Sequence, residues 1–233
     1  SYQRIQFTSD LLPADIIGVS VFEADTGQFR FHRGPVFAQL VLADEVNRAT
    51  PKAQSALLEA MEEHQVTADG QTYPLTEPFF VIATQNPTDL SGTFPLPDSQ
   101  LDRFMLRISM GYISADQERA LLKSSGNLHG TLSAAFEDAV GLIEIRRQVA
   151  ALHASDALID YVQRLIAQSR QFTGVRVGLS PRAGISLLAA GKAHAYLDGR
   201  DFVNANDIQA VFIDPFMGVL ALFLTGAMSV QIG

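Results

Sequence analysis

Two almost wholly apolar runs, each ending in polar residues, constrain the fold of this chain more than any other feature. The first run is Val36–Ala43, followed by Asp44 and Glu45, and the second is Phe79–Thr84, with Asn86 two residues later. A strand that is apolar on both faces belongs in the middle of a sheet covered by helices, typically a parallel sheet. Between the runs, a Thr-Pro pair opens a segment whose apolar residues recur at helical spacing. The pattern therefore predicts an α/β fold.

The rest of the first half fits the same class of fold. Alternation around Ile5 and Phe7 predicts a short strand, and Phe104–Ile108 predicts another, with a short helix near Ser99–Asp102 before it. Residues 18–34 carry two runs of alternating apolar residues around a turn that contains Gly, which is typical of a β-hairpin. Strands that alternate with helical segments indicate an α/β architecture for this half.

The second half of the chain changes character and predicts helices. Four helices are expected to begin behind a polar capping residue: Ser114, Ser155, Ser180 and Asn204. Residues 136–150 have a helical pattern as well. We therefore predict two domains, an α/β domain over residues 1–113 and a helical domain over residues 114–233, with no strand in the second.

The composition excludes some classes of function. The 233 residues include 17 basic and 25 acidic side chains, which gives a formal net charge of −8, and no cluster of Lys and Arg offers a surface that neutralises phosphates. We therefore expect no nucleic-acid binding. The chain has no Cys, hence no disulfide framework and no thiolate metal site, and its start has no signal-peptide pattern. These features favour a cytoplasmic protein.

Residues 216–232 form an uncharged apolar tail that is interrupted by Thr225, Ser229 and Gln231. The tail is shorter than the ~20 apolar residues that a membrane span needs, so we do not expect it to cross a membrane. Two explanations of its composition stay open: a buried helix of the helical domain, or a segment translated outside the native reading frame.

Asp44, Glu45 and Asn86 are the first candidates for chemistry, because they follow the two apolar strands. Open α/β sheets bind ligands beyond the carboxyl ends of their strands. Asp44 could hold Mg²⁺, which prefers hard oxygen ligands, and Glu45 could polarise an attacking water as a general base. The Asn86 amide could donate to a phosphate oxygen or orient that water. The structural alternatives are acids that simply end a strand and a turn residue before Pro87.

Two arginines are candidates for contact with an anion. Arg103 directly precedes an apolar strand, where a guanidinium held in a fixed place could neutralise charge on a transferring phosphoryl group. Arg182 follows Ser180 and Pro181 in the first turn of a predicted helix, where the helix dipole disfavours a cation by roughly 0.3–1 kcal/mol. A phosphate nearby would turn that position into an anion site. The alternative for both arginines is an ion pair with an acidic residue.

Other catalytic classes lack their motifs in this sequence. The five His residues show no metal-ligand spacing, and neither G-x-S-x-G nor H-E-x-x-H is present. The phosphate-binding loop G-x-x-x-x-G-K-[ST] is also absent, since the Gly191-Lys192 pair lies inside a predicted helix. A metal hydrolase built on Asp44 and Glu45 is not supported, because the sequence offers no further metal ligands near them.

Taken together, these features resemble the MoxR family of AAA+ ATPases over about residues 1–210. The matching motif residues are Asp44 and Glu45 of Walker B, Asn86 of sensor 1, Arg103 of the arginine finger and Arg182 of sensor 2. The hairpin of residues 18–34 resembles the insertion in helix 2 that marks this family's clade. The helical half resembles the AAA+ lid.

The resemblance implies an ATPase that couples ATP hydrolysis to chaperone-like remodelling or maturation of partner protein complexes. ATP would bind between the α/β part and the lid, with Asp44 on Mg²⁺, Glu45 activating water and Asn86 positioning that water. Arg182 would report the γ-phosphate to the lid, and Arg103 would act on a neighbour's nucleotide. The active form would then be a homo-oligomeric ring, a hexamer, with a von Willebrand factor A domain protein as partner.

The sequence departs from the family at its start, where the Walker A loop and its strand are missing. That strand would lie between the strands matching Phe79–Thr84 and Phe104–Ile108, so two apolar edges would lose their partner. We therefore expect this chain by itself to be inactive and to bind little or no nucleotide. The alternative function is a non-hydrolysing AAA+-like module for interaction or assembly, but the retention of all five motif residues favours the ATPase.

Overall fold

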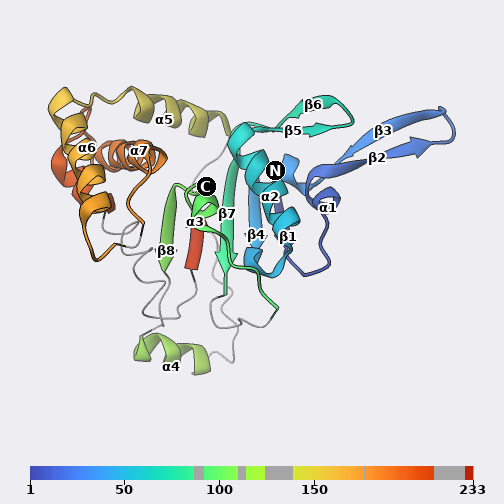
Figure 1. The fold of residues 1–233 in the computed structure, drawn as a ribbon, viewed down its shortest axis with the longest axis horizontal. Helices are drawn as coiled ribbons and strands as arrows, with labels where there is room; N and C mark the ends of the chain where they lie inside the picture. The colour runs from blue at the N-terminus through green and yellow to red at the C-terminus, as the bar shows by residue number, and fades with distance from the viewer. Residues whose placement is uncertain (87–91, 110–113, 124–138, 176, 213–228, 233) are drawn as a thin grey trace.

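The computed structural model describes residues 1–86, 92–109, 114–123, 139–175, 177–212 and 229–232. Figure 1 shows a sheet in the middle of the molecule, with a group of helices on one side and two β-hairpins projecting from the other. The sheet and the helices have separate hydrophobic cores. This arrangement confirms the predicted class, an α/β part followed by a helical part.

The central sheet contains five strands. They are β1 (Tyr2–Gln6), β4 (Leu40–Asp44), β7 (Phe80–Gln85), β8 (Leu106–Ser109) and β9 (Ser229–Ile232). Their order across the sheet is β1-β4-β7-β9-β8, and β4 pairs in parallel with both β1 and β7. Strand β9 runs antiparallel to β7 and to β8, so β8 points in the same direction as β4 and β7.

Strands β4 and β7 bury one face of the sheet more tightly than the other. Val41 and Ala43 lie opposite Val81 and Ala83 in the parallel register, and all four side chains are fully buried. Leu42, whose side chain points to the opposite face, is only half-buried. The prediction of two fully covered faces is therefore wrong for the second face.

Short helical elements accompany the sheet. They are α1 (Pro13–Ile17), η1 (Pro35–Phe37), η2 (Val46–Arg48), α2 (Pro51–Glu63) and α3 (Asp98–Leu101), where η denotes a 3₁₀ turn. Leu57 and Leu58 of α2 are fully buried in the core of the sheet. Turn η1 takes the start of the first apolar run, so the strand begins at Leu40 and not at Val36 as predicted. Pro35 favours that turn, because it offers no N–H to a strand ladder.

Two β-hairpins project from the α/β part (Figure 1). Their strands are β2 (Gly18–Glu23) with β3 (Gln28–Arg33), and β5 (Gln65–Ala68) with β6 (Gln71–Pro74). The sequence predicts the first hairpin but not the strands of the second. Strands of four residues give too short an alternation to be detected.

The helical part contains α4 (Ala115–Lys123), α5 (Ala139–Ala151), α6 (Asp156–Gln171), α7 (Pro181–Leu197) and a helical segment at residues 205–212. The Ser155 and Ser180 side chains accept hydrogen bonds from the backbone N–H groups of Leu158 and Ala183, as predicted for caps. Residues 136–138 of the predicted fifth helix lie outside the described residues. Among the described helices, none combines the length and the apolar character that crossing a bilayer requires.

The end of the chain contradicts the prediction that no strand follows the α/β domain. Residues 216–228 of the apolar tail lie outside the described part of the chain, but Ser229–Ile232 form β9 of the central sheet. This strand occupies the place between β7 and β8 where two unpaired edges were expected. Its ladders satisfy backbone groups of both neighbours, which explains why it joins the sheet.

We expect Leu57→Ala to lower the free energy of unfolding of the protein by about 2–5 kcal/mol, because it leaves a cavity in a tightly packed core. Urea-induced unfolding followed by circular dichroism measures this change. Glu59→Ala, on the exposed face of the same helix, is the control and should change stability by less than about 0.5 kcal/mol. Equal losses for the two variants would contradict the assigned core.

Candidate functional site

Asp44 and Glu45 lie at the carboxyl edge of the sheet, as the sequence predicts for a ligand site. Asp44 is the last residue of β4, and the neighbouring strand β7 brings Thr84 beside it. The Thr84 hydroxyl donates to Asp44 Oδ1 at 2.5 Å and accepts a hydrogen bond from the Glu45 backbone N–H at 2.9 Å. The Thr84 hydroxyl therefore binds both acidic residues to the neighbouring strand. Asp44 and Glu45 are called the acidic pair below.

Asp44 is held in its ionised form by its hydrogen bonds. The bond from Thr84, followed by those from Arg4 at 2.5 Å and 3.2 Å, lowers the pKa of the Asp44 carboxyl. Arg4 comes from β1, on the other side of β4. Both Arg4 bonds end on Oδ2, so among the described contacts Oδ1 accepts one hydrogen bond and keeps a lone pair for a cation or a water.

Glu45 has different contacts from Asp44 because the backbone turns between them. Its φ and ψ angles of 55° and 47° lie in the left-handed region, which a residue with a side chain adopts only at a cost. The Glu45 carboxylate accepts hydrogen bonds from Gln6 at 2.9 Å and from Arg48 at 3.1 Å. The two acids thus have separate surroundings, which allows them different roles in catalysis.

The turn after Glu45 connects the ends of the two strands. Asn47 of η2 donates its side-chain amide to the backbone oxygen of Asn86 at 3.2 Å. Gln54 of α2 is 1% exposed, and its amide nitrogen donates to two backbone oxygens near this turn, each at 3.1 Å, and to that of Phe94 at 2.8 Å. The structure therefore places the Asn86 backbone beside the turn that follows the acidic pair.

Arg103 and Arg182 meet each other on Glu62, in the last turn of α2. Arg103 donates to Glu62 Oε2 at 2.8 Å, and Arg182 donates to Oε1 of the same carboxylate. Beside them, the Ser180 hydroxyl lies 2.7 Å and 2.9 Å from the two carboxylate oxygens of Asp102. The two predicted anion-binding arginines, the arginine pair, are therefore neighbours within one subunit.

The sheet topology places the arginine pair at the edge opposite to the acidic pair. Arg103 lies three residues before Leu106, the first residue of β8, whereas Asp44 is the last residue of β4. The two strands point the same way, since β7 is parallel to β4 and both β7 and β8 are antiparallel to β9. The structure thus groups Arg182 with Arg103, whereas the resemblance implies that Arg182 contacts the subunit's own nucleotide.

The sequence patterns do not single out three residues that the structure places at the site: Thr84, Gln54 and Glu62. Thr84 carries a weak signal, because it is a polar residue at the end of an apolar strand. Gln54 is a polar residue on the apolar face of α2, and such a residue usually has buried partners. Glu62 carries no local signal, because its partner Arg182 is 120 residues away.

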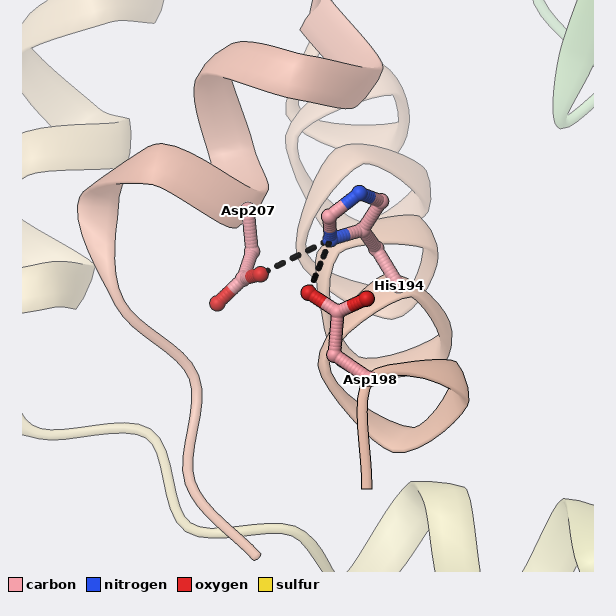
Figure 2. Close-up of side chains that lie close together, drawn as sticks. All are labelled: His194, Asp198 and Asp207. Carbon is pink, nitrogen blue, oxygen red and sulfur yellow. Dashed lines mark hydrogen bonds and ion pairs between the residues drawn. The ribbon is translucent and has the colours of Figure 1, made fainter. Parts of the chain in front are cut away.

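A cluster of His194, Asp198 and Asp207 in the helical part brings metal-type ligand atoms within 4.8 Å of one another (Figure 2). His194 Nδ1 lies 2.8 Å from Asp207 and 3.9 Å from Asp198. Arg200 donates to both carboxylates, at 2.7 Å to Asp207 Oδ2 and at 3.0 Å to Asp198 Oδ2. Because Arg200 donates to both carboxylate oxygens of Asp207 and also to Asp198, we interpret the cluster as an ion-pair network that stabilises the helical part.

Comparisons with known proteins identify the class of protein to which this fold belongs. Residues 1–106 match the family model described as ATPase family associated with various cellular activities (AAA), and residues 167–214 match the AAA lid domain. The crystal structure of a Cytophaga hutchinsonii protein that was proposed to be an ATPase has a TM-score of 0.77 and 38% identity, over 92% of this chain and 68% of that one. The fold is that of an AAA domain followed by its lid.

Curated relatives narrow the class to a family. YeaC of Bacillus subtilis is 46% identical over 92% of this chain and 67% of its own length. Chaperone MoxR1 of Mycobacterium tuberculosis is 38% identical over 92% of this chain and 59% of its own length. Protein MoxR of Paracoccus denitrificans is 32% identical over 90% of this chain and 69% of its own length. The chain belongs to the MoxR family of AAA ATPases, and it spans 59% to 69% of the length of these relatives.

Buried Asp207 makes the stability of the helical part depend on pH. Its side chain is 1% exposed, and hydrogen bonds from Arg200, from the Asn204 backbone and from His194 hold its pKa well below the ordinary value. A carboxyl whose pKa is lowered by folding stabilises the fold above its unfolded pKa of about 3.9. That contribution is lost as the pH falls below about 4.

We expect Asp207→Asn to lower the free energy of unfolding at pH 7 by about 1–3 kcal/mol, because Arg200 loses a buried charged partner. The variant should also lose less stability than the wild type between about pH 4 and pH 2. Urea unfolding at stepped pH measures both effects. The control is Asp198→Asn, which removes a 56% exposed partner of the same arginine and should cost less than about 1 kcal/mol. Identical pH profiles for wild type and Asp207→Asn would contradict the interpretation.

Proposed function

We propose that the full-length protein is an ATPase that couples ATP hydrolysis to chaperone-like remodelling of partner protein complexes. The observation that carries this proposal is the acidic pair at the carboxyl edge of the sheet. Its Asp44 is held ionised, and the left-handed backbone at Glu45 gives the Glu45 carboxylate different hydrogen-bond partners from those of Asp44. Membership of the AAA ATPases supports the reaction class. The name of one relative, Chaperone MoxR1, supports the remodelling role.

In this proposal Asp44 holds the Mg²⁺ of the bound nucleotide and Glu45 activates the attacking water. The donor set fits that metal, because Asp44 supplies an ionised carboxylate whose Oδ1 keeps a lone pair. Mg²⁺ there would neutralise charge on the phosphates. The hydrogen bonds that Glu45 accepts from Gln6 and Arg48 orient its carboxylate, which can take a proton from water. Asn86, anchored through its backbone, would position that water.

The position of the arginine pair supports a homo-oligomeric ring as the active form. Arg103 and the acidic pair occupy opposite edges of one sheet, so Arg103 would serve the nucleotide of a neighbouring copy. A repeated head-to-tail contact of this kind closes into a ring. On the family resemblance, we propose a hexamer that works with a von Willebrand factor A domain protein.

The activity is proposed for the full-length protein, because the phosphate-binding loop G-x-x-x-x-G-K-[ST] is not among these 233 residues. The place that β9 occupies between β7 and β8 is the place where the family resemblance expects the strand that carries this loop. The 233 residues by themselves are therefore proposed to be inactive as an ATPase.

In the full-length protein, we expect Glu45→Gln to lower kcat for ATP hydrolysis by about 100-fold to 10,000-fold, because an amide cannot take the proton of the attacking water. ATP binding should change by no more than about twofold, since Asp44 is unaltered. Phosphate release at saturating ATP measures turnover, and titration with a fluorescent nucleotide measures binding. Glu59→Gln removes the same charge from the exposed face of α2 and should hydrolyse ATP at the wild-type rate.

Two results would overturn this assignment in different ways. Unchanged hydrolysis by Glu45→Gln would remove Glu45 from its role while leaving the protein an ATPase. A wild-type protein that assembles but hydrolyses no ATP would favour the non-hydrolysing assembly module.

We expect Arg103→Ala to abolish most ATP hydrolysis by the full-length protein, as loss of an arginine finger costs about 10³-fold or more. Mixing it with Glu45→Gln should restore part of the activity, because the intact acidic pair of one subunit then meets the intact Arg103 of the other. Phosphate release measured across mixing ratios, with each variant on its own as the baseline, checks this. Mixtures that never exceed the sum of the two variants would exclude action between subunits.

A further inference from the structure

We propose that Glu62 is a positioning residue that joins Arg103 and Arg182 into one unit, which is presented to the nucleotide phosphates of a neighbouring subunit. The proposal rests on the proposed ATPase function and adds to it a direct link between the lid and the arginine finger. It starts from one contact, in which a single carboxylate accepts both guanidinium groups, one on each oxygen.

The charges explain the part that Glu62 plays in this arrangement. Two positively charged guanidinium groups repel each other, and a shared anion between them offsets that repulsion. Each arginine carries five N–H donors, of which the contact with Glu62 uses only a part. The Arg103 and Arg182 side chains are 32% and 43% exposed, so part of each guanidinium group is open to a ligand. The three residues together keep one positive charge, and the guanidinium fork suits a phosphate group.

A second contact ties the same two segments together. Ser180 donates to Asp102, the residue directly before Arg103. The Ser180 hydroxyl also accepts a hydrogen bond from the Ala183 N–H at 3.0 Å, so the residue that caps α7 is the residue that binds the α/β part. Displacement of the first turn of α7 would break both contacts. A movement of the lid would therefore shift Arg182 and change the hold on Arg103.

The neighbouring glutamates of α2 provide an internal comparison. Glu59 and Glu63 line the same hollow of about 310 Å³ as Glu62 and Arg103. The ion pairs of both arginines nevertheless end on Glu62. Glu59 lies one helical turn earlier and has the same charge, which makes Glu59→Gln the matched control for Glu62→Gln.

The test uses the full-length protein. We expect Glu62→Gln to lower kcat about 100-fold, the scale on which misplacement of a catalytic group by about 1 Å acts. KM for ATP should stay within about twofold, because the acidic pair of the same subunit is untouched. Glu62→Asp keeps the charge and should recover part of kcat. In an Arg103→Ala/Arg182→Ala background, Glu62→Gln should have no further effect, since Glu62 acts through those arginines.

Mixed assemblies separate a positioning role from a loss of fold. Glu62→Gln mixed with Glu45→Gln should recover activity, because the first variant keeps an intact acidic pair and the second keeps an intact arginine unit. A misfolded subunit would not complement its neighbour in this way. An unchanged kcat in Glu62→Gln, or a further loss in the double-arginine background, would overturn the proposal.

Hydrogen exchange separates failure of this proposal from failure of the proposed function. In the nucleotide-free protein, Glu62→Gln should raise exchange of the backbone amides in the first turn of α7, including Ala183, severalfold, whereas Glu59→Gln should not. If the wild type hydrolyses no ATP but exchange rises, the link between lid and α/β part stands and the proposed function fails. If the wild type hydrolyses ATP and neither exchange nor kcat responds, the proposal for Glu62 fails and the function stands.

Discussion

The parallel pairing of β4 with β7 is the constraint on which the rest of the structure depends. Its register sets Ala43 beside Ala83 in the buried face of the sheet. One residue further along, the same register brings Thr84 to Asp44, where the hydroxyl binds the acidic pair. A shift by one residue would exchange the buried and half-buried faces and would also separate the hydroxyl from the carboxylate. The hydrophobic core and the candidate site therefore have a common cause.

Strands β4, β7 and β8 all point in the same direction, so their carboxyl ends lie on one side of the sheet and their amino ends on the opposite side. The acidic pair lies on the first side, and Arg103 lies on the second. Both groups come from a single chain, yet they lie at opposite ends of the strands. In the proposed ring, copies that meet head to tail would bring these two ends of the sheet together.

Local patterns predict the parts of this molecule whose causes are local. The apolar runs locate β4 and β7, the capping serines locate α6 and α7, and the strand ends group Asp44 and Glu45 with Asn86, because these effects act within a few residues or along one sheet edge. Strand β9 could not be predicted from its own composition, since its place depends on the open edges of β7 and β8. Glu62 could not be predicted either, since its partner Arg182 is 120 residues away.

The contacts that the sequence predicts least well are also the ones best suited to move. The α/β part and the helical part each have their own hydrophobic core, so each gains most of its stability internally. Two polar contacts join them: the partly exposed ion pair of Glu62 with Arg182, which contributes about 0–1 kcal/mol, and the hydrogen bond from Ser180 to Asp102. Such a joint can open without unfolding either part. A lid that must respond to a nucleotide requires a weak polar joint of this kind, because a shared apolar core would hold it in one position.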